Sequence, residues 1–405
     1  MSDISSSASD TGSRNQRVIV VANGLFGAQL AGGDVHLLHS IKAFLEAGWQ
    51  VECFGGRVLQ AHLAQWNLPA SVISTDSKSN AVLSDATLGG KIRLFIEFFR
   101  RFVATLTQLR AIKHTDVVFS ATDYWFDVLP IAFSGARLKV VILQMKAPSL
   151  REVIFRSRAD VEAIRVASLY YCFSQWVSLA VLRFCKLKRV VSVQPLLQSM
   201  LRRRGYTVDE TPVIPNGVEV AAAQDAAGEA KRFDVVWMGR VHRQKGIEDL
   251  LATLVFLARE IPDFRAILIG NLREALGARI TELGLGSHVE FTGFVSGVEK
   301  FRWLRRARVF LMPSQHEGLP IVVGEALACE LPVVAYELEM YRPYFGDLLT
   351  YVRPFALEAF QRTAASTVLR LRADGQLQNE SKLAEFLLQN SWPVVEKRLA
   401  QLIET

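Results

Sequence analysis

The stretch 309–335 constrains the fold more than any other part of this sequence. An apolar segment at 309–312 runs into a polar loop that ends at Gly318, and Pro320 then opens a segment of helical character. Proline suits the first turn of a helix because its φ is fixed and it has no N–H. A second apolar segment follows at 332–335. This order of strand, loop, helix and strand predicts one repeat of a parallel α/β sheet.

Two glutamates stand eight residues apart in this stretch, Glu317 at the turn and Glu325 inside the helix. A helix that starts after a parallel strand exposes N–H groups at the carboxyl edge of the sheet, and these groups suit an anion such as phosphate. The carboxylates beside them suit hydroxyl groups instead. Phosphate donors and hydroxyl acceptors in one loop predict a site for a nucleotide sugar, although Glu325 could also simply favour the helix dipole.

A second strand end carries two cations. The apolar run at 235–238 is followed by Gly239 and Arg240, and then by Lys245 and Gly246. Breaking the bond of a nucleotide sugar leaves a diphosphate, and fixed cations stabilise its growing negative charge. A lone Arg or Lys is ordinarily solvated, but the flanking glycines allow close approach of the backbone and favour a role in binding. Because two cations are present and no Asp-x-Asp metal-ligand motif occurs, we expect that no metal or other cofactor is required.

The pattern of Glu317, Gly318, an apolar residue, Pro320 and Glu325 resembles the donor-binding signature of glycosyltransferase family 4. This family comprises retaining glycosyltransferases of the GT-B fold, also called glycosyl transferases group 1. Other stretches are similar to elements of the same family: 213–218, 236–246, 283–294, Ser391 with Trp392, and Gly32 with Gly33 after the first apolar run. The strong matches cover 213–345 and 388–403, whereas the first half matches more weakly, as an acceptor-binding domain would.

Apolar runs alternate with helical stretches in both halves of the chain, which predicts two doubly wound parallel sheets. The resemblance implies the GT-B architecture, in which two Rossmann-like domains face a central cleft. We expect a disordered tail at 1–15, an N-terminal acceptor-binding domain at 16–212 and a C-terminal nucleotide-sugar-binding domain at 213–387. A C-terminal helix at 388–405 is expected to pack back toward the N-terminal domain.

The resemblance also implies roles for the polar residues of the two loops. Gly239, Arg240 and Lys245 would bind the diphosphate. Glu325 would bind the ribose hydroxyls, and Glu317 would contact the sugar hydroxyls near the anomeric carbon. Glu317, Arg240 and Lys245 are therefore the expected catalytic residues.

The turn between the two glutamates completes the expected donor site. Gly318, Leu319 and Pro320 would shape it, and the N–H groups of Gly318 and Leu319 could meet donor oxygens, whereas proline has no N–H to offer. His316 either lines the donor site or is an ordinary loop residue.

Three residues of the first half are candidates for contacts with the donor phosphate or the acceptor. Gly32 and Gly33 could let backbone N–H groups approach either molecule, or could form only a flexible turn before a helix. Asp123 follows the apolar strand at 116–120 and could orient an acceptor hydroxyl or cap the next helix.

The sequence departs from the family at three places near this site. Many relatives carry a sugar-contacting histidine after the strand at 140–143, where this chain has Gln144 and Lys146, either of which could substitute. Glu330 stands where relatives have the glycine that ends the helix, so an easy left-handed cap is lost. The Gly-rich loop that is common after the next strand is replaced by 336–342. The expected diphosphate and ribose contacts are left intact.

The first half carries all of the excess positive charge. Residues 1–212 hold 25 Lys and Arg against 16 Asp and Glu, whereas 213–405 hold 22 against 24. Nucleic acid or an anionic membrane could bind such a basic face. The helix predicted at 91–106 has apolar residues at helical spacing with basic residues around them, which is typical of a helix that lies on a membrane. We therefore expect an anionic membrane surface, and no nucleic acid, among the partners.

The run 166–182 has no charged residue. Three interpretations stay open: a core helix of the first domain, a helix in the membrane interface, or a marginal membrane span. The N-terminal residues lack the apolar stretch of a signal peptide. The four cysteines have no metal-ligand spacing, which indicates buried free thiols and a reducing compartment. The expected location is the cytoplasm, either free or peripheral on the inner face of the membrane.

The resemblance implies a retaining, metal-independent hexosyltransferase that uses a nucleotide-sugar donor. The acceptor would be a glycan or lipid-linked, in surface polysaccharide or lipopolysaccharide synthesis. The alternative is a non-catalytic nucleotide-sugar-binding or scaffolding subunit of the same fold, since the histidine is missing. A nucleotide-sugar epimerase lacks support because the paired glutamates are typical of transferases. A nicotinamide dehydrogenase is disfavoured because no G-x-G-x-x-G follows the first strand.

Overall fold

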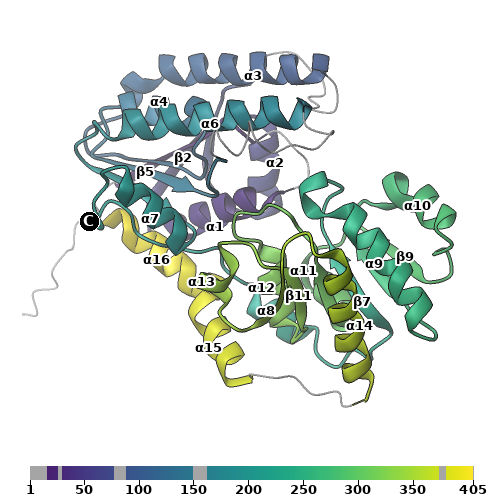
Figure 1. Cartoon of the computed structure of the whole chain (residues 1–405). Helices are drawn as coiled ribbons and strands as arrows, with labels where there is room; N and C mark the ends of the chain where they lie inside the picture. The colour runs from purple at the N-terminus through teal and green to yellow at the C-terminus, as the bar shows by residue number, and fades with distance from the viewer. Residues whose placement is uncertain (1–15, 26–29, 77–87, 149–161, 374–379, 405) are drawn as a thin grey trace, which may run out of the picture. The chain divides into compact units, whose positions relative to one another are not determined.

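The computed structural model of the chain describes residues 16–25, 30–76, 88–148, 162–373 and 380–404 (Figure 1). The tail expected at 1–15 lies outside these residues. The chain divides into two compact units. The first unit takes in segments 1–29, 40–141 and 174–188, and the second takes in 30–39, 142–173 and 189–405. The domain bounds expected from the sequence stay a prediction.

The first sheet has six strands in the order β3-β2-β1-β4-β5-β6. They are β1 (Arg17–Ala22), β2 (Gln50–Gly55), β3 (Ser71–Ser74), β4 (Val117–Ser120), β5 (Leu138–Leu143) and β6 (Lys188–Ser192). The central strand β1 pairs in parallel with β2 and β4. A strand that is buried on both faces needs a continuous apolar run, and residues 18–21 of β1 are at most 1% exposed.

Helices connect the strands of this sheet, as in other doubly wound folds. They are α1 (Gly32–Glu46), α2 (Arg57–Gln65), α3 (Leu88–Thr107), α4 (Trp125–Phe133) and α6 (Glu162–Leu182), with the 3-10 turn η1 at Leu109–Ala111. Helix α7 (Pro195–Arg203) follows the last strand. Helix α3 runs along α4 (Figure 1).

The second sheet also has six strands, in the order β12-β11-β10-β7-β8-β9, and its neighbouring strands run parallel. They are β7 (Phe233–Met238), β8 (Ala266–Ile269), β9 (Val289–Gly293), β10 (Ala307–Met312), β11 (Val333–Tyr336) and β12 (Leu349–Val352). Large side chains such as Trp237, Phe264 and Phe360 fill its core and are at most 1% exposed.

The helices of the second half are again interleaved with strands. They are α8 (Val220–Asp225), α9 (Ile247–Glu260), α10 (Arg273–Glu282), α11 (Gly297–Arg305), α12 (Ile321–Ala328), α13 (Tyr341–Phe345), α14 (Leu357–Ala373), α15 (Glu380–Asn390) and α16 (Trp392–Glu404), with the 3-10 turn η2 at Arg243–Lys245. The prediction of two doubly wound parallel sheets is confirmed.

The sequence analysis missed two strands, β3 and β12. Both lie at the edge of their sheets. An edge strand is covered on fewer sides than a central one, and each of these contains exposed or half-exposed residues. Neither strand therefore shows the uninterrupted apolar run that revealed the central strands.

Helix α16 packs on the first half of α1 within the second unit. The ring of His39 stacks on Trp392 with ring centroids 3.5 Å apart and planes 9° apart. The Nδ1 atom of His39 lies 2.7 Å from Oε1 of Glu396. Aromatic stacking and a buried polar contact thus fasten the two helices to each other.

Helix α6 contains the uncharged run 166–182. Within its second half, Ser174, Gln175 and Ser178 are at most 1% exposed, whereas Phe173 and Trp176 are exposed. The hydroxyl of Ser174 accepts the backbone N–H of Trp125 at 2.9 Å. Among the described residues, no helix has the length and apolar character to cross a membrane.

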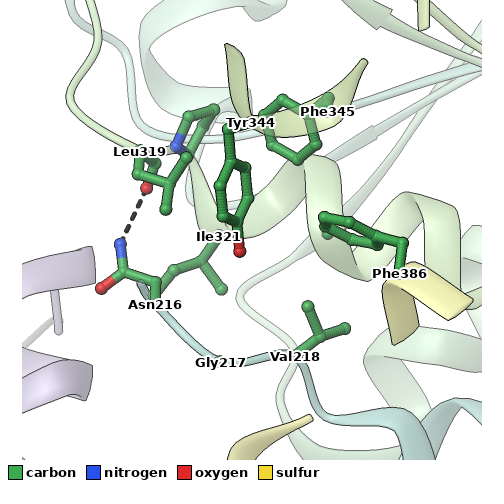
Figure 2. Close-up of a pocket in the computed structure, with 10 residues that line it drawn as sticks. Asn216, Gly217, Val218, Leu319, Ile321, Tyr344, Phe345 and Phe386 are labelled. Atoms are coloured by element: carbon green, nitrogen blue, oxygen red, sulfur yellow. Dashed lines mark hydrogen bonds between the residues drawn. The ribbon is translucent and has the colours of Figure 1, made fainter. Parts of the chain in front are cut away.

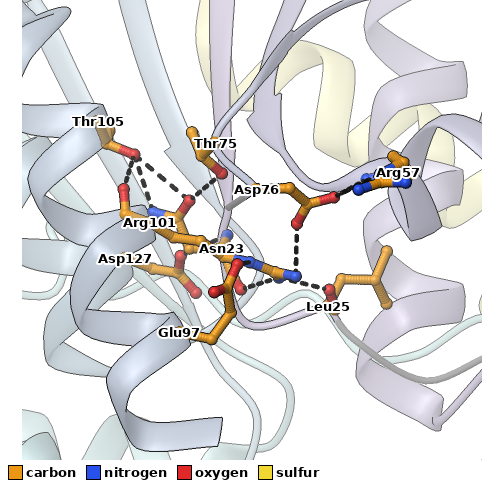
Figure 3. Close-up of polar contacts among 9 residues, drawn as sticks. All are labelled: Asn23, Leu25, Arg57, Thr75, Asp76, Glu97, Arg101, Thr105 and Asp127. Carbon is orange, nitrogen blue, oxygen red and sulfur yellow. Dashed lines mark hydrogen bonds and ion pairs between the residues drawn. The ribbon is translucent and has the colours of Figure 1, made fainter. Parts of the chain in front are cut away.

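A buried polar cluster lies at the carboxyl edge of the first sheet (Figure 3). Arg101 of α3 donates to the backbone carbonyls of Asn23 at 2.8 Å and Leu25 at 3.0 Å. It also forms ion pairs with Asp76 at 2.7 Å and Glu97 at 3.4 Å, and its side chain is only 3% exposed. The guanidinium therefore ties α3 to the chain that follows β1 and β3.

Asp127 of α4 belongs to the same cluster. It is fully buried and accepts the N–H of Asn23 at 2.8 Å and the hydroxyl of Thr122 at 2.5 Å. Burial raises the pKa of Asp127 to about 7, although these hydrogen bonds and the charge of Arg101 act in the opposite direction. The carboxyl group therefore holds its proton at a pH where an exposed aspartate is ionised.

The replacement Asp127→Asn should remove a pH dependence of stability. An unfolded aspartate titrates near pH 3.9, so between about pH 4 and 7 the folded state binds more protons than the unfolded state. The contribution of Asp127 is therefore full at low pH and is lost as the pH rises through about 7. Urea midpoints measured from pH 5 to 8 should fall with pH in the wild type relative to the variant. Parallel curves for the two proteins would contradict the raised pKa.

The turn that ends helix α12 contains a residue that the sequence predicted to be unfavourable there. Glu330 has φ of +59°, in the left-handed region. The N–H of Glu330 bonds to Leu327 O at 2.9 Å, and the N–H of Leu331 bonds to Ala326 O at 3.0 Å. This is the Schellman arrangement, in which glycine normally occupies the left-handed position.

The replacement Glu330→Gly should stabilise the second unit by about 1 kcal/mol. A side chain in the left-handed region costs about 1–2 kcal/mol, but glycine loses more backbone entropy on folding, which offsets part of the gain. The ion pair that is lost, with Arg305 at 4.0 Å, is exposed on the Glu330 side and weak. Thermal unfolding would show a midpoint raised by a few degrees. Glu330→Ala is the matched control: it removes the carboxylate and keeps the strain, so it should give no gain.

Candidate functional site

Two loops of the second unit meet at the carboxyl edge of its sheet. One follows β7 and contains Arg240 and Lys245, and the other follows β10 and contains Glu317. Strands β7 and β10 are neighbours in the sheet. The N–H of Gln315 donates to the carbonyl of Gln244 at 2.7 Å, which joins the two loops directly. The expected proximity of Lys245 and Glu317 therefore follows from strand order.

Gly246 allows this close approach. Its φ is +68°, and a Cβ atom at this position would lie 1.9 Å from the carbonyl oxygen of Pro313. No side chain fits there, because the obstructing carbonyl group belongs to the backbone of the other loop and cannot move without that loop. The glycine also serves as the N-cap of α9.

Lys245 and Glu317 form an ion pair in the structure. The Nζ atom of Lys245 lies 2.7 Å from Oε1 of Glu317, and their side chains are 18% and 7% exposed. An ammonium group has three N–H donors, so this contact leaves donors of Lys245 for a second anion.

Arg240 is the other expected phosphate ligand. It follows Gly239 directly after β7 and is exposed. Unlike Lys245, it has neither a hydrogen bond nor an ion pair from its side chain within the described parts of the chain. Gly239 packs against the ring of Trp237, which a Cβ atom would approach to 3.0 Å. The guanidinium is thus available at the strand end.

Glu325 of α12 has a partner that the sequence analysis missed. Its Oε1 atom lies 2.5 Å from Nζ of Lys300, which reaches over from α11. The Glu325 and Lys300 side chains are 8% and 14% exposed. Burial lowers the pKa of Lys300, but the charges of Glu325 and Glu219 outweigh it and the net shift is upward. Lys300 is therefore a cation in direct contact with the expected ribose-binding carboxylate.

The turn that begins at Gly318 is fixed from several sides. The side chain of Asn216 donates to the carbonyl of Leu319 at 2.8 Å (Figure 2). Its Oδ1 atom faces Nδ1 of His36 at 2.8 Å. Burial lowers the pKa of His36 to about 4, so the ring is neutral, and its Nδ1–H donates to the amide oxygen. Pro320 is the N-cap residue of α12, as the sequence indicated.

A small apolar cavity lies beside this turn. It is lined largely by Ile321, Tyr344, Phe345 and Phe386 (Figure 2). Its lining has no charged side chain, and the cations and carboxylates of the two loops are not part of it.

Gln144 lies against the turn, whereas Lys146 does not. A Cβ atom on Gly318 would come within 2.5 Å of the carbonyl oxygen of Gln144. A Cβ atom on Gly33 would lie 3.7 Å from the Gln144 side chain. Lys146 instead faces Glu339, with Nζ 3.9 Å from Oε2. Of the two residues considered as substitutes for the missing histidine, Gln144 is the one beside the glycines.

Gly32 and Gly33 form the start of α1 within the second unit. Added Cβ atoms would meet other residues no closer than 3.5 and 3.7 Å, and neither glycine has a left-handed φ. The protein's own packing therefore does not require glycine here. Their use in binding stays a prediction.

Tyr341 is a further residue that sequence reasoning missed. It lies in the segment that replaces the family's Gly-rich loop, and it is fully buried. Burial, and then the charge of Glu317, raise the pKa of its hydroxyl. In the described part of the chain this hydroxyl has no hydrogen-bond partner. His316, next to Glu317, is half-buried.

Asp123 belongs to the first unit, whereas the residues described above belong to the second. It is 3% exposed and accepts a hydrogen bond from Gln175 at 2.7 Å. The N-cap residue of α4 is Tyr124, and the first N–H of the helix, that of Trp125, donates to Ser174. The alternative that Asp123 caps the next helix is therefore wrong, and its role toward an acceptor stays a prediction.

The site thus combines Arg240, Lys245 and Glu317 in the loops at one sheet edge, and Glu325 lies in the helix that follows the second loop. Arg240 and Lys245 can bind a diphosphate, because fixed cations favour its charge. Glu317 and Glu325 can accept hydrogen bonds from hydroxyl groups. The described residues contain no cluster of three or more His, Cys, Asp or Glu side chains suited to a metal ion.

The family model of glycosyl transferases group 1 matches residues 222–364. The GDP-mannose-dependent alpha-(1-6)-phosphatidylinositol monomannoside mannosyltransferase of Mycolicibacterium smegmatis is 33% identical over 137 residues, which are 32% of this chain and 36% of that protein. The lipopolysaccharide core biosynthesis mannosyltransferase LpcC of Rhizobium leguminosarum is 29% identical over 145 residues, 32% of this chain and 41% of that protein. The chain spans less than half the length of the curated relatives it matches.

Solved structures extend the similarity to nearly the whole chain. Sucrose-phosphate synthase from Thermosynechococcus elongatus aligns with a TM-score of 0.66 at 18% identity, over 96% of this chain and 98% of that one. WaaG, a glycosyltransferase involved in lipopolysaccharide biosynthesis, aligns with a TM-score of 0.65 at 13% identity, over 96% and 100%. At such identities the likeness establishes the fold. The chain has the GT-B fold, and its residues 222–364 match the family model of glycosyl transferases group 1.

Proposed function

We propose that this chain is a retaining glycosyltransferase that moves a hexose from a nucleotide-sugar donor to a glycan or lipid-linked acceptor. The pathway we propose is the synthesis of surface polysaccharide or lipopolysaccharide. One observation carries the proposal: the hydrogen-bonded loops after β7 and β10 bring Arg240, Lys245 and Glu317 to one sheet edge. The mannosyltransferase names of the relatives agree with this class of reaction.

Arg240 and Lys245 are the proposed ligands of the donor diphosphate. Arg240 has no ion-pair partner among the described residues, so its guanidinium can form a bidentate contact with phosphate oxygens without first breaking another bond. Lys245 keeps one contact with Glu317 and offers its remaining donors to the phosphate. With two cations on the leaving group, the proposed transfer needs no metal ion.

The carboxylates are the proposed ligands of the sugar parts. Glu325, inside α12, accepts hydrogen bonds from the ribose hydroxyls, and Glu317, at the turn, accepts them from the hexose. The N–H groups of Gly318 and Leu319 face donor oxygens in this arrangement, with Pro320 and His316 beside them. Gln144 takes the place of the missing histidine. Gly32 and Gly33 let the backbone approach the donor phosphate, and Asp123 serves the acceptor.

The proposed reaction is a same-face substitution. The bond between the anomeric carbon and the phosphate oxygen breaks, and the acceptor oxygen bonds to that carbon on the same face of the sugar. The acceptor proton passes to the leaving phosphate oxygen, so the nucleoside diphosphate departs with it. Arg240 and Lys245 stabilise the negative charge that builds on this group.

Arg240→Ala should weaken binding of a nucleoside diphosphate by about 10–100-fold, since a charge-assisted hydrogen bond contributes about 1.5–3 kcal/mol. Isothermal titration with UDP and GDP measures this directly and also shows which base is preferred. The variant should fold normally, because Arg240 is exposed and has no ion-pair partner within the described residues.

Arg279→Ala is the matched control for Arg240→Ala. Arg279 lies on α10 of the same unit and pairs with Glu248 on the surface at 2.6 Å. Its removal deletes the same charge and should leave nucleotide affinity unchanged. Equal affinity of wild type and Arg240→Ala for both nucleotides would refute the proposed diphosphate site.

The peripheral membrane attachment that we propose rests on an unusual helix. Helix α3 buries three polar side chains and exposes a stripe of apolar ones. Glu97, Arg101 and Thr105 are at most 7% exposed. The outward stripe is 42–53% exposed and consists of Ile92, Phe95, Ile96, Phe99 and Val103. Such a stripe loses contact with water only if something apolar covers it.

The charges beside this stripe favour an anionic bilayer as the cover. Arg93 and Arg100 are exposed on the same helix. An apolar face flanked by cations is typical of a helix that lies in the membrane interface. A lipid-linked acceptor would be held at the same surface, which is consistent with the proposed reaction.

The double replacement Phe95→Asp and Phe99→Asp should abolish flotation with vesicles of phosphatidylglycerol, because it places charge where acyl chains would lie. Wild-type flotation should weaken as salt is raised, since the arginine contribution is screened. Leu388→Asp is the control, as Leu388 of α15 is also an exposed apolar residue, at 74%. Flotation of the double variant at the wild-type level would show that α3 is not the contact.

A further inference from the structure

Lys300 carries a function that neither the sequence motifs nor the proposed reaction assigns. Its Nζ atom lies 2.5 Å from Oε1 of Glu325 and 4.6 Å from the centroid of the Phe301 ring. We infer that Lys300 is a positioning residue: it holds one oxygen of Glu325 so that the other oxygen, Oε2, accepts hydrogen bonds from the ribose hydroxyls of a nucleoside diphosphate. The inference rests on the proposed function, which assigns Glu325 to the ribose.

Fastening of α11 does not explain the pair. Arg305 of the same helix already donates to the carbonyl of Ala223 at 2.9 Å and to that of Ala328 at 3.4 Å. These contacts tie α11 to α8 and α12. A buried ion pair is a weak source of stability, because removing two charges from water costs as much as their attraction returns. Lys300 and Glu325 are therefore better explained by what the carboxylate must do.

A carboxylate that binds a ribose must stay ionised and must keep its orientation. An ionised carboxyl group only accepts hydrogen bonds, whereas a protonated one also donates. Burial by itself favours the protonated form, and a cation in contact reverses that preference. Lys300 supplies the cation at Oε1. In the structure, the side chain of Glu325 has no other hydrogen bond or ion pair to any described residue, so Oε2 is left for the ligand.

The arrangement also lowers the entropy cost of binding. A glutamate side chain that is held in one rotamer before the ligand arrives loses little freedom when the ligand binds. The ring of Phe301 packs on the cation side of the pair, which restricts Lys300 in turn. The ribose therefore meets a carboxylate whose orientation is already fixed.

The test compares each nucleotide with its analogue that lacks the ribose hydroxyls. Isothermal titration is carried out with UDP and GDP and with 2′,3′-dideoxy-UDP and 2′,3′-dideoxy-GDP. The wild type should bind the ribonucleotide at least about 10-fold more tightly than the dideoxy analogue, as expected for lost hydrogen bonds to a charged group. In Lys300→Met this preference should fall to about threefold or less, with little change in affinity for the dideoxy form.

This ratio separates positioning from a structural effect. General loosening of the site would weaken both nucleotides alike and would leave the ratio unchanged. Lys300→Arg keeps the cation and should keep the preference. Arg302→Met is the matched control: Arg302 lies on the same helix, is exposed and pairs with Glu299 at 3.5 Å, so its loss should not alter the ratio. If Lys300→Met does not fold, Lys300→Leu, which also has no donor for Oε1, gives the same comparison.

The outcomes distinguish the two levels of the proposal. If the wild type binds none of the nucleoside diphosphates, the proposed function itself fails. If the wild type prefers the ribonucleotide and the neutral Lys300 variants keep that preference, the positioning role is overturned while the donor site stands. Equal binding of ribose and dideoxy forms by the wild type would overturn both the assignment of Glu325 and the role of Lys300.

Discussion

The backbone contact between the loops after β7 and β10 underlies the rest of the second unit's chemistry. The hydrogen bond from Gln315 to Gln244 holds the loops together. Gly246, which has no Cβ, lets the carbonyl of Pro313 approach. Because neighbouring parallel strands end at the same edge, two sequence segments some seventy residues apart become one surface. Lys245 and Glu317 can pair only because this surface exists.

Both glutamates of the candidate site are paired with a lysine. Each of the two expected sugar-binding carboxylates has its own lysine: Lys245 beside Glu317, and Lys300 beside Glu325. A buried carboxylate without a cation would be costly to keep ionised. Lys245 lies in the loop after β7, whereas Lys300 lies on α11. The roles that we propose for the two lysines therefore differ: direct binding for Lys245 and orientation of Glu325 for Lys300.

Much of the donor half could be predicted from the sequence, for a physical reason. The central strands of a doubly wound sheet are continuous apolar runs, and the residues after them must lie at one edge. Glu317, Pro320 and Arg240 could thus be placed near each other before any coordinates were known. The edge strands β3 and β12 escaped notice because half-exposed strands lack such runs.

The contacts that sequence reasoning missed all depend on packing between elements. Nothing in the local sequence of α11 marks Lys300, because its partner lies on another helix. Arg101 was counted among the basic residues around an apolar helix, yet its side chain is buried and binds backbone carbonyls. Periodicity predicts that a helix has two faces, but not which face the sheet covers. For α3 the protein covers the polar one, which is the opposite of the usual arrangement.

The dipeptide Asn216–Gly217 is a site where the fold affects the rate of a chemical modification, deamidation. An asparagine followed by glycine is prone to deamidation, since little hinders attack of the next backbone nitrogen on the amide. Gly217 cannot be replaced by another residue, because a Cβ atom there would come within 2.4 Å of the Trp392 ring. The amide of Asn216 cannot be replaced either, because its oxygen accepts a hydrogen bond from His36 and its nitrogen donates one to the carbonyl of Leu319. While the turn stays packed, these two hydrogen bonds fix the orientation of the amide. Loss of that packing would allow slow deamidation of Asn216. The resulting aspartate could no longer donate a hydrogen bond to the carbonyl of Leu319.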